Sequence, residues 1–137
     1  MSKLYTWCFA CGPDNPIGLK LKFREENGQY IANFTAGPEH QGYDGILHGG
    51  IVSTLLDEIM TRYPYHLGFH TVTARLEVRF LKPTPIGVQL TVVGWIVKQK
   101  GRLFELRGEV RLPDGTVTAE GQAAAMVRAA VQKEVGD

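Results

Sequence analysis

The apolar residues near the start of the chain alternate with polar ones, which is the period of a β-strand. Residues 19–23 alternate in this way, Glu26-Asn27-Gly28 is typical of a turn, and residues 30–34 resume the alternation. Two alternating runs joined by a short turn that contains glycine are typical of a β-hairpin. The pattern therefore predicts a hairpin over residues 19–35.

The next periodic segment is the longest and has the period of a helix. Its apolar residues recur at spacings of three and four, which places them on one face of a helix. These residues are Ile51, Val52, Leu55, Leu56, Ile59, Met60 and Tyr63. Because proline lacks a backbone N–H, we expect a helix of about four turns that ends near Pro64.

After this segment the period returns to two. Residues 75–80 alternate charged and apolar, and three further strands are predicted between turn-forming residues: 88–98, 102–112 and 116–128. A single apolar helix and an antiparallel sheet bury their apolar faces by packing on each other. The predicted fold is therefore α+β, with a curled antiparallel sheet wrapped around one long central helix.

Length and charge limit the classes of function. The chain has 137 residues, which is about one domain with one site, and residues 129–137 form a polar end that we interpret as a tail. Its 15 Lys and Arg residues are interspersed with 14 Asp and Glu residues, so we expect no nucleic-acid partner. No apolar run approaches the ~20 residues of a membrane span, and no signal peptide is recognisable. Two cysteines, Cys8 and Cys11, are too few for a disulfide framework. These features favour a cytoplasmic protein that does not bind membranes.

The candidate chemistry lies where the predicted helix begins. The run Gly45-Ile46-Leu47-His48-Gly49-Gly50 leads directly into it, and Asp57 and Glu58 follow on the helix. Glycine N–H groups at the positive end of a helix dipole favour an oxygen that carries negative charge. A carboxylate on a mostly apolar helix is hydrogen-bonded, paired or functional. Donor and base together indicate hydrolysis of an acyl compound.

The spacing of donor and base favours two subunits. Gly50 and Asp57 are seven positions apart, so roughly 10 Å of helix separates them. A base and an oxyanion donor must both approach one reacting group within about 3 Å. Two antiparallel copies of the helix in a two-fold dimer satisfy this requirement. Alternatively, the glycines only let the chain enter the helix and Asp57 sits at its exposed edge; the spacing alone does not decide between these interpretations.

These residues resemble the hot-dog fold thioesterases, and more closely the phenylacetic-acid-degradation type of acyl-CoA thioesterase. The family pattern of a Gly, two residues, His-Gly-Gly and an Asp nine positions after the His is matched by Gly45, His48, Gly49, Gly50 and Asp57. Residues 71–83 are also similar to a strand of that family. The resemblance covers residues 17–128 and leaves residues 1–18, with Cys8 and Cys11, as an N-terminal extension.

The resemblance implies hydrolysis of acyl-CoA without a cofactor, since coenzyme A is part of the substrate. The N–H of Gly49 or Gly50 polarises the thioester carbonyl, and Asp57 of the facing subunit acts as general base or as nucleophile. Thr73 corresponds to a hydroxyl residue that helps to hold the water, although an ordinary strand residue is an alternative. The expected assembly is a homodimer or a dimer of dimers.

Other residues near the motif have competing interpretations. His48 bonds the substrate or pins the loop through a backbone contact, and we favour the second. Glu58 lies about 100° further around the helix than Asp57 and is expected to be exposed or salt-bridged. Gln41 is the candidate for positioning the acyl carbonyl, where the family often has a polar residue.

Basic residues and cysteines outside the motif are weaker candidates. Lys82 and Arg102 are candidates for contacts with the phosphates of coenzyme A, or they are solvated charges at sheet edges. The thiolates of Cys8 and Cys11 make half of a tetrahedral zinc shell, so a metal requires His40, another residue or the second subunit. We therefore favour structural packing of the two thiols and predict no metal.

Two other functions compete with the thioesterase hypothesis. One is a hot-dog hydratase or dehydratase, which needs a His and an acid that converge on the substrate; the position of Asp57 argues against it. The other is a non-catalytic acyl-CoA binding or regulatory domain. The absence of a DNA-binding segment weakens the regulatory reading.

Overall fold

The computed structural model describes residues 6–130, which form one long α-helix and six strands in the predicted order. The elements are β1 (Phe23–Glu26), β2 (Gln29–Thr35), a 3-10 turn η2 (Pro38–His40), α1 (Gly49–His66), β3 (Phe69–Phe80), β4 (Gln89–Lys100), β5 (Leu103–Arg111) and β6 (Val117–Ala130). The predicted tail beyond residue 130 lies outside the described residues. The predicted α+β class is confirmed.

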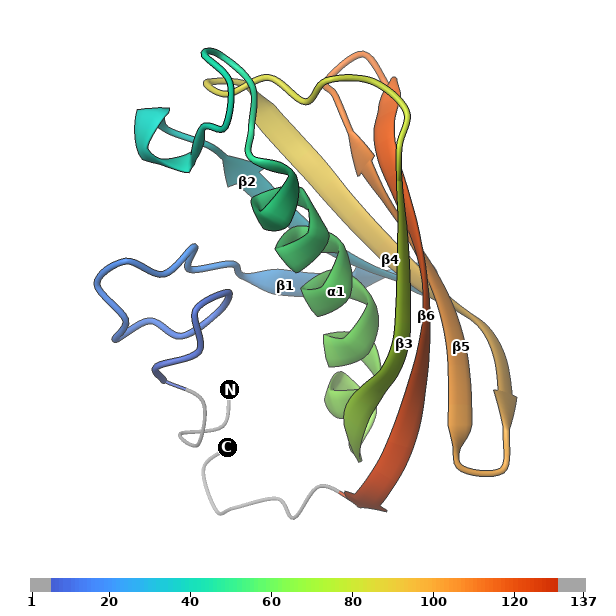
Figure 1. The fold of residues 1–137 in the computed structure, drawn as a ribbon. Coiled ribbons are helices and arrows are strands. Elements are labelled where there is room, and N and C mark those ends of the chain that lie inside the picture. The colour runs from blue at the N-terminus through green and yellow to red at the C-terminus, as the bar shows by residue number, and fades with distance from the viewer. Residues whose placement is uncertain (1–5, 131–137) are drawn as a thin grey trace.

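The six strands form a single antiparallel sheet in the order β1-β2-β4-β5-β6-β3. Tight turns join β1 to β2, β4 to β5 and β5 to β6, while α1 carries the chain from β2 across the sheet to β3. Figure 1 shows the sheet curling around α1, which lies on its concave side. This is the arrangement expected of the hot-dog fold.

A row of glycines lets α1 lie close against the sheet. Gly94, Gly108 and Gly121 pair across three neighbouring strands, β4, β5 and β6. A Cβ atom at Gly94 would lie 2.8 Å from the carbonyl oxygen of Ile59, and one at Gly121 would lie 2.9 Å from Cε of Met60. The core of the domain therefore forms where the helix backbone approaches this row, with Val52, Leu55, Leu56, Ile59 and Met60 at most 1% exposed.

The predicted hairpin is shorter than the alternation indicated. Residues 19–22 are not part of β1, and Lys20 has a φ of 56°, which is incompatible with an extended strand. Instead the N–H groups of Leu19 and Leu21 donate to the carbonyl oxygens of Phe9 and Ala10. These residues are buried against the N-terminal segment, which explains their apolar character.

The helix begins where the motif predicts and is longer than predicted at its C-terminal end. It begins at Gly49 and continues past Pro64 to His66. Pro64 is tolerated because it lies in the last turn, where the N–H of Leu67 reaches back to the carbonyl oxygens of Tyr63 and Pro64. Within residues 6–130 no helix is both long and apolar enough to cross a membrane.

Strand β3 differs from the other long strands because it lies at the edge of the sheet. It pairs with β6 on one side, and most of its residues are exposed. Its exposed apolar residues include Val72, Leu76 and Phe80, which are 45%, 37% and 58% exposed. The alternation in residues 75–80 thus predicted the strand correctly, but it does not mark a face buried in the core of this chain.

Candidate active site

The start of α1 is fixed by His48. His48 is the N-cap residue, and its Nδ1 accepts a hydrogen bond of 2.8 Å from the N–H of Gly50. The carbonyl oxygen of His48 accepts hydrogen bonds from the N–H groups of Ile51 and Val52. His48 thus makes a backbone contact of the kind we favoured. Because Nδ1 is the acceptor, the proton of a neutral His48 lies on Nε2.

These contacts distinguish Gly49 from Gly50 as an oxyanion donor. Three of the first four N–H groups of α1, those of Gly50, Ile51 and Val52, have acceptors, and within the described residues that of Gly49 has none. Gly49 is exposed and lies at the positive end of the helix dipole. The N–H of Gly49 is therefore the group available to a negatively charged oxygen.

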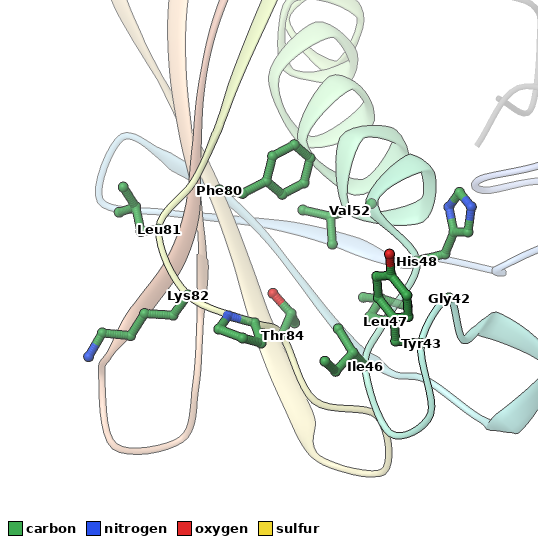
Figure 2. Close-up of a pocket in the computed structure, with 12 residues that line it drawn as sticks. Gly42, Tyr43, Ile46, Leu47, His48, Val52, Phe80, Leu81, Lys82 and Thr84 are labelled. Carbon is green, nitrogen blue, oxygen red and sulfur yellow. The ribbon is translucent and has the colours of Figure 1, made fainter.

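Gly49 lies beside a hollow of about 700 Å³. Figure 2 shows Phe80 and Leu81 on one side of this hollow, Val52 of α1 at its back, and Ile46 and Tyr43 of the preceding loop on the other side. Most of the lining is apolar, which suits an acyl group or the apolar part of a larger ligand. The side chain of Lys82 lies at the edge, with its amino group directed away from the ring of Phe80.

Asp57 and Thr73 are brought together from α1 and β3. The hydroxyl of Thr73 donates a hydrogen bond of 3.1 Å to Oδ1 of Asp57. The register of β3 against β6 shifts between Thr73 and Arg75, which leaves Ala74 as a bulged residue. Bulges redirect side chains and are frequent next to active sites. This bulge lies directly after the residue whose hydroxyl contacts Asp57.

The surroundings of Asp57 make it a stronger base than an exposed aspartate. Burial raises the pKa of Asp57 above its ordinary value, and the hydrogen bond from Thr73 opposes this shift. α1 is continuous from Gly49 to Asp57, so roughly 12 Å of helix separates the two residues within one chain. The structure thus provides a donor and a base, but one subunit does not place them at the same reacting group.

Gln41 lies on the other side of the start of α1. Its Oε1 accepts a hydrogen bond of 2.7 Å from the N–H of Gly45, which holds the loop before the motif. Together with His48, Gly50 and Thr54 it lines a second hollow of about 430 Å³. The amide nitrogen of Gln41 is the part of the side chain that is left to donate to a carbonyl.

Arg102 is far from Gly49 within the same chain. It lies at the turn between β4 and β5, and its guanidinium donates to the carbonyl oxygens of Val127 and Arg128. Figure 1 places this turn at the end of the sheet opposite to the start of α1. Of the two predicted phosphate contacts, only Lys82 is therefore near the hollow beside Gly49.

Glu58 lies next to Asp57 in sequence, but its surroundings are different. Its Oε2 is 3.9 Å from Nε of Arg62, and both side chains are largely buried. The expectation of a salt bridge is confirmed, while Glu58 is not exposed. Glu58 also lies beside Cys8 and Cys11 of the N-terminal segment. No local pattern indicates this cluster, because the cysteines and the glutamate are far apart along the chain.

Comparison with known proteins gives a consistent result. Residues 44–119, more than half of the chain, match the family described as Thioesterase superfamily. The chain is similar to the acyl-coenzyme A thioesterase THEM4 of Bos taurus, with 28% identity over 108 residues, which are 77% of this chain and 44% of that protein. The chain thus spans less than half of the length of this relative.

Solved structures share the fold. The protein smu.793 of Streptococcus mutans, bound to acetyl CoA, has a TM-score of 0.76 and 22% identity over 82% of this chain and 91% of that one. The PaaI protein of the Escherichia coli phenylacetic acid degradation operon has a TM-score of 0.76 and 16% identity over 83% of this chain and 84% of that one. The resemblance to the thioesterase family that the motif indicated is confirmed by the family match and by the relative THEM4.

Proposed function

Because the chain belongs to the thioesterase superfamily, we propose that it hydrolyses an acyl-coenzyme A thioester to a free acid and coenzyme A. The observation that carries the proposal is the N–H of Gly49, which has no acceptor among the described residues and lies beside a largely apolar hollow. The name of the relative THEM4 and the acetyl CoA bound to smu.793 support this substrate class. The proposed reaction needs the thioester and water, and no cofactor.

In this mechanism the N–H of Gly49 donates to the thioester oxygen as negative charge develops on it. A donor aimed at the developing oxyanion is worth most where water is excluded. The N–H of Gly50 is already bonded to His48, so its part is to hold His48 in place. The carbonyl oxygen of His48 accepts hydrogen bonds from the N–H groups of Ile51 and Val52, so these groups do not compete with Gly49 for the substrate.

The base comes from a second copy of the chain. Within one subunit Asp57 is too far along α1 to reach a carbon held by Gly49. In a two-fold dimer with antiparallel helices, Asp57 of each subunit approaches Gly49 of the other and two equivalent sites form. We therefore propose a homodimer as the smallest active unit, with a dimer of dimers as a larger assembly of the same sites.

The exposed edge of β3 supports this assembly. A long edge strand with exposed apolar side chains is an association site unless something covers it. Val72, Leu76 and Phe80 form such an edge, and Thr73, which contacts Asp57, lies on the same strand. A second copy on this edge covers the apolar residues and brings its own start of α1 toward Asp57.

Asp57 either removes a proton from the attacking water or attacks the carbonyl itself. As a general base it takes the water proton while the thiolate of coenzyme A leaves. As a nucleophile it forms a mixed anhydride that water then hydrolyses. Thr73 holds the carboxylate through its hydrogen bond, and in the first route it also holds the water.

Substrate contacts outside the reacting group are part of the same proposal. Lys82, at the edge of the hollow beside Gly49, is our first candidate for the phosphates of coenzyme A. Arg102 is a second candidate only for a substrate that extends to the far end of the sheet. Gln41 positions the acyl carbonyl through its amide nitrogen. The free thiols of Cys8 and Cys11 support the expected cytoplasmic location.

A substitution that removes the N–H of Gly49 tests the proposed oxyanion donor directly. Gly49 is the first residue of α1, where proline fits because its fixed φ suits the helix and no N–H is needed there. Gly49→Pro therefore removes the donor with little change in the fold. We expect a loss of roughly 10²- to 10³-fold in kcat, measured as thiol release from a panel of acyl-CoAs.

Gly49→Ala is the matched control, since it adds a Cβ atom and retains the N–H. That Cβ would lie 3.5 Å from the ring of Phe80, which is an ordinary contact. If Gly49→Pro and Gly49→Ala have equal activity, the oxyanion assignment is wrong. If the wild type releases no thiol from any acyl-CoA but binds one saturably, the non-catalytic binding function replaces this proposal. Hydration of an enoyl-CoA without thiol release would favour the hydratase.

A further inference from the structure

The N-terminal segment holds a cluster of side chains that the proposed reaction does not use. Sγ of Cys8, Sγ of Cys11 and a carboxylate oxygen of Glu58 lie within 4.8 Å of one another. Tetrahedral zinc, with Zn–S distances of about 2.3 Å and Zn–O distances of about 2.0 Å, places its donors roughly 3.5 to 3.8 Å apart. A contraction of about 1 Å therefore turns this cluster into three corners of a zinc tetrahedron.

We propose that Cys8, Cys11 and Glu58 bind a divalent zinc-class ion that fastens the N-terminal segment to α1. The cysteine pair alone lacked a third donor, which is why the sequence favoured packing of the two thiols. The fold supplies that donor from α1. Two thiolates and one carboxylate suit zinc, and a water or a further group completes the shell.

The carboxylate of Glu58 has a side-chain hydrogen bond with Cys11, but one of its two oxygens lacks a partner in the part of the chain that the structure describes. Its Oε2 is buried, and within the described residues it accepts no hydrogen bond. The Nε of Arg62, at 3.9 Å, is beyond hydrogen-bond distance of this oxygen. A buried acceptor without a donor costs about 1 to 3 kcal/mol, and coordination to a cation removes that cost.

The charges around the cluster balance when the ion is present. Two thiolates, one carboxylate and a divalent cation carry a net charge of −1, which the guanidinium of Arg62 beside Glu58 offsets. Binding releases the two thiol protons to solvent. Without the ion, burial raises the pKa of Cys11 to about 12 and raises the pKa of Glu58, while the guanidinium of Arg62 opposes both shifts.

The backbone already holds the two cysteines in position. The N–H of Gly12 donates to the carbonyl oxygen of Cys8 at 2.8 Å, and a Cβ atom at Gly12 would collide with the backbone nitrogen of Cys8. Only glycine therefore allows the chain to close so tightly after Cys11. The segment is fastened to the domain by hydrogen bonds from Leu19 to Phe9 and from Leu21 to Ala10.

One member of the cluster, Cys11, lines a hollow through which an ion could approach. This hollow of about 670 Å³ is lined by Cys11 and Arg62, with Lys20, Tyr30 and Tyr65 around it. The donor set, the unpartnered oxygen, the charge balance and the entry path are the features expected of a metal site. The site fastens residues 6–18 to α1 at the residue next to Asp57, on a different side of the helix.

Cobalt binding tests this site without any measurement of turnover. The full chain is stripped with a chelator, kept reduced with a phosphine and titrated with Co²⁺. We expect one Co²⁺ per chain, an intense thiolate-to-cobalt band in the near ultraviolet and the strong visible bands of a tetrahedral ion, all displaced by Zn²⁺. Zinc also protects two thiols per chain from alkylation.

Variants assign the donors. Cys8→Ser and Cys11→Ser lose the charge-transfer band in whole or in part. Glu58→Gln weakens Co²⁺ binding by roughly 100-fold or more, since the loss of even an outer partner of a metal ligand costs about 10- to 100-fold. Because Cys11 is buried and its variant is the one most at risk of misfolding, Cys8→Ser and Glu58→Gln carry the test, with circular dichroism as the check on folding.

Two matched acids serve as controls for binding. Asp14→Asn changes an exposed acid in the same segment, and Asp57→Asn changes the acid next to Glu58; both retain the cobalt spectrum. The proposal is overturned if Glu58→Gln binds Co²⁺ as tightly as Asp14→Asn, or if the reduced wild type shows only the weak spectrum of an octahedral ion. A Cys8–Cys11 disulfide in the protein, with no cobalt binding after its reduction, also overturns it.

Discussion

Asp57 and Glu58 are adjacent acids on one helix, yet their surroundings give them different chemistry. Asp57 faces the edge strand β3 and receives a hydrogen bond from the hydroxyl of Thr73. Glu58 faces the N-terminal segment and has the cation of Arg62 and two thiols beside it. Burial raises the pKa of both carboxyls. Burial therefore does not distinguish the two acids. They differ in their partners, which are the neutral hydroxyl of Thr73 for Asp57 and the guanidinium of Arg62 with two thiols for Glu58.

These different surroundings let one helix serve two purposes. A carboxylate that has a neutral hydrogen-bond donor keeps most of its basicity, which suits proton transfer. A carboxylate beside a guanidinium and thiols is held by charge and suits a structural or metal-binding role. The turn of about 100° between neighbouring helical residues is enough to separate these roles.

Removing the charge of Asp57 should change turnover more than any other substitution. Asp57→Asn keeps the size of the side chain but removes the base, so we expect kcat to fall by roughly 10²- to 10⁴-fold while cobalt binding is retained. Glu58→Gln should show the reverse, with turnover within about tenfold of wild type and weak cobalt binding. Thiol release and cobalt titration of the same preparations measure both.

The control for this pair is Asp14→Asn, because Asp14 is exposed and its substitution should change neither turnover nor cobalt binding. Equal turnover of Asp57→Asn and wild type would remove the catalytic assignment of Asp57. A loss of turnover in Glu58→Gln as large as that in Asp57→Asn would transfer the assignment to Glu58.

The next effect tests whether Asp57 acts across the proposed dimer. Chains with Asp57→Asn and chains with Gly49→Pro carry different tags and are coexpressed, and the mixed dimer is isolated on both tags. Each parent is inactive in both sites, whereas the mixed dimer has one site with an intact Gly49 and an intact Asp57. We expect about half of the wild-type rate from it.

The mixed dimer gives no rescue if donor and base act within one chain, because then every chain carries one defect. The matched mixture of Asp57→Asn with Gly49→Ala should have about half of the wild-type rate whether the base acts across the dimer or within one chain, so it calibrates the activity of an isolated mixed dimer. A wild type that sediments as a monomer while it turns over substrate would exclude the second copy altogether.

The third prediction concerns how much Arg62, which lies beside Glu58, contributes to the free energy of unfolding. Arg62→Met leaves a largely buried carboxylate beside thiols without its cation. We expect the free energy of unfolding of the metal-free protein to fall by roughly 2 to 3 kcal/mol, because the loss of one partner of a buried pair costs more than the pair contributes. Urea unfolding at fixed protein concentration measures this change.

The double variant Arg62→Met/Glu58→Gln separates charge from packing. Arg62 also lies over the ring of Tyr65, at 4.6 Å, and that contact is lost in both variants. If the charge of Glu58 is the cause, the double variant is more stable than Arg62→Met alone. If the two variants are equally unstable, the packing of Arg62 accounts for its contribution.

The sequence predicted the elements well because their periods are local properties. The alternation and the helical spacing identified all six strands and α1 in the right order. The prediction was wrong for residues 19–22, where apolar residues pack on the N-terminal segment and Lys20 has a positive φ. Alternation shows that every second residue is buried, but not which element buries it.

Features that depend on register or on distant residues were not predictable from the sequence. The glycine row of Gly94, Gly108 and Gly121 becomes a row only when three strands are aligned. The bulge at Ala74, next to Thr73, becomes visible only when the pairing of β3 with β6 is known on both sides of it. Likewise, the third donor beside Cys8 and Cys11 comes from α1. The motif indicated Gly49 and Gly50 together, and only the hydrogen bond of His48 distinguishes them.

A subtler change is expected in the pH dependence of turnover. A base works only when ionised, so the rate should fall as the pH drops through the pKa of Asp57, which burial places above its ordinary value. The hydrogen bond from Thr73 stabilises the ionised form and lowers this pKa. Thr73→Val removes that hydrogen bond, so the acid limb of the profile of kcat/KM should move to higher pH.

Thr73→Ser is the matched control, because it retains the hydroxyl and should retain the position of the acid limb. A purely structural role of Thr73 would lower the rate at every pH and leave the limb in place. An acid limb that moves to lower pH in Thr73→Val would mean that the hydroxyl favours the protonated carboxyl. The same measurement on Glu58→Gln should leave the limb unmoved, since the group that titrates in this reaction is Asp57, on the β3 side of the helix.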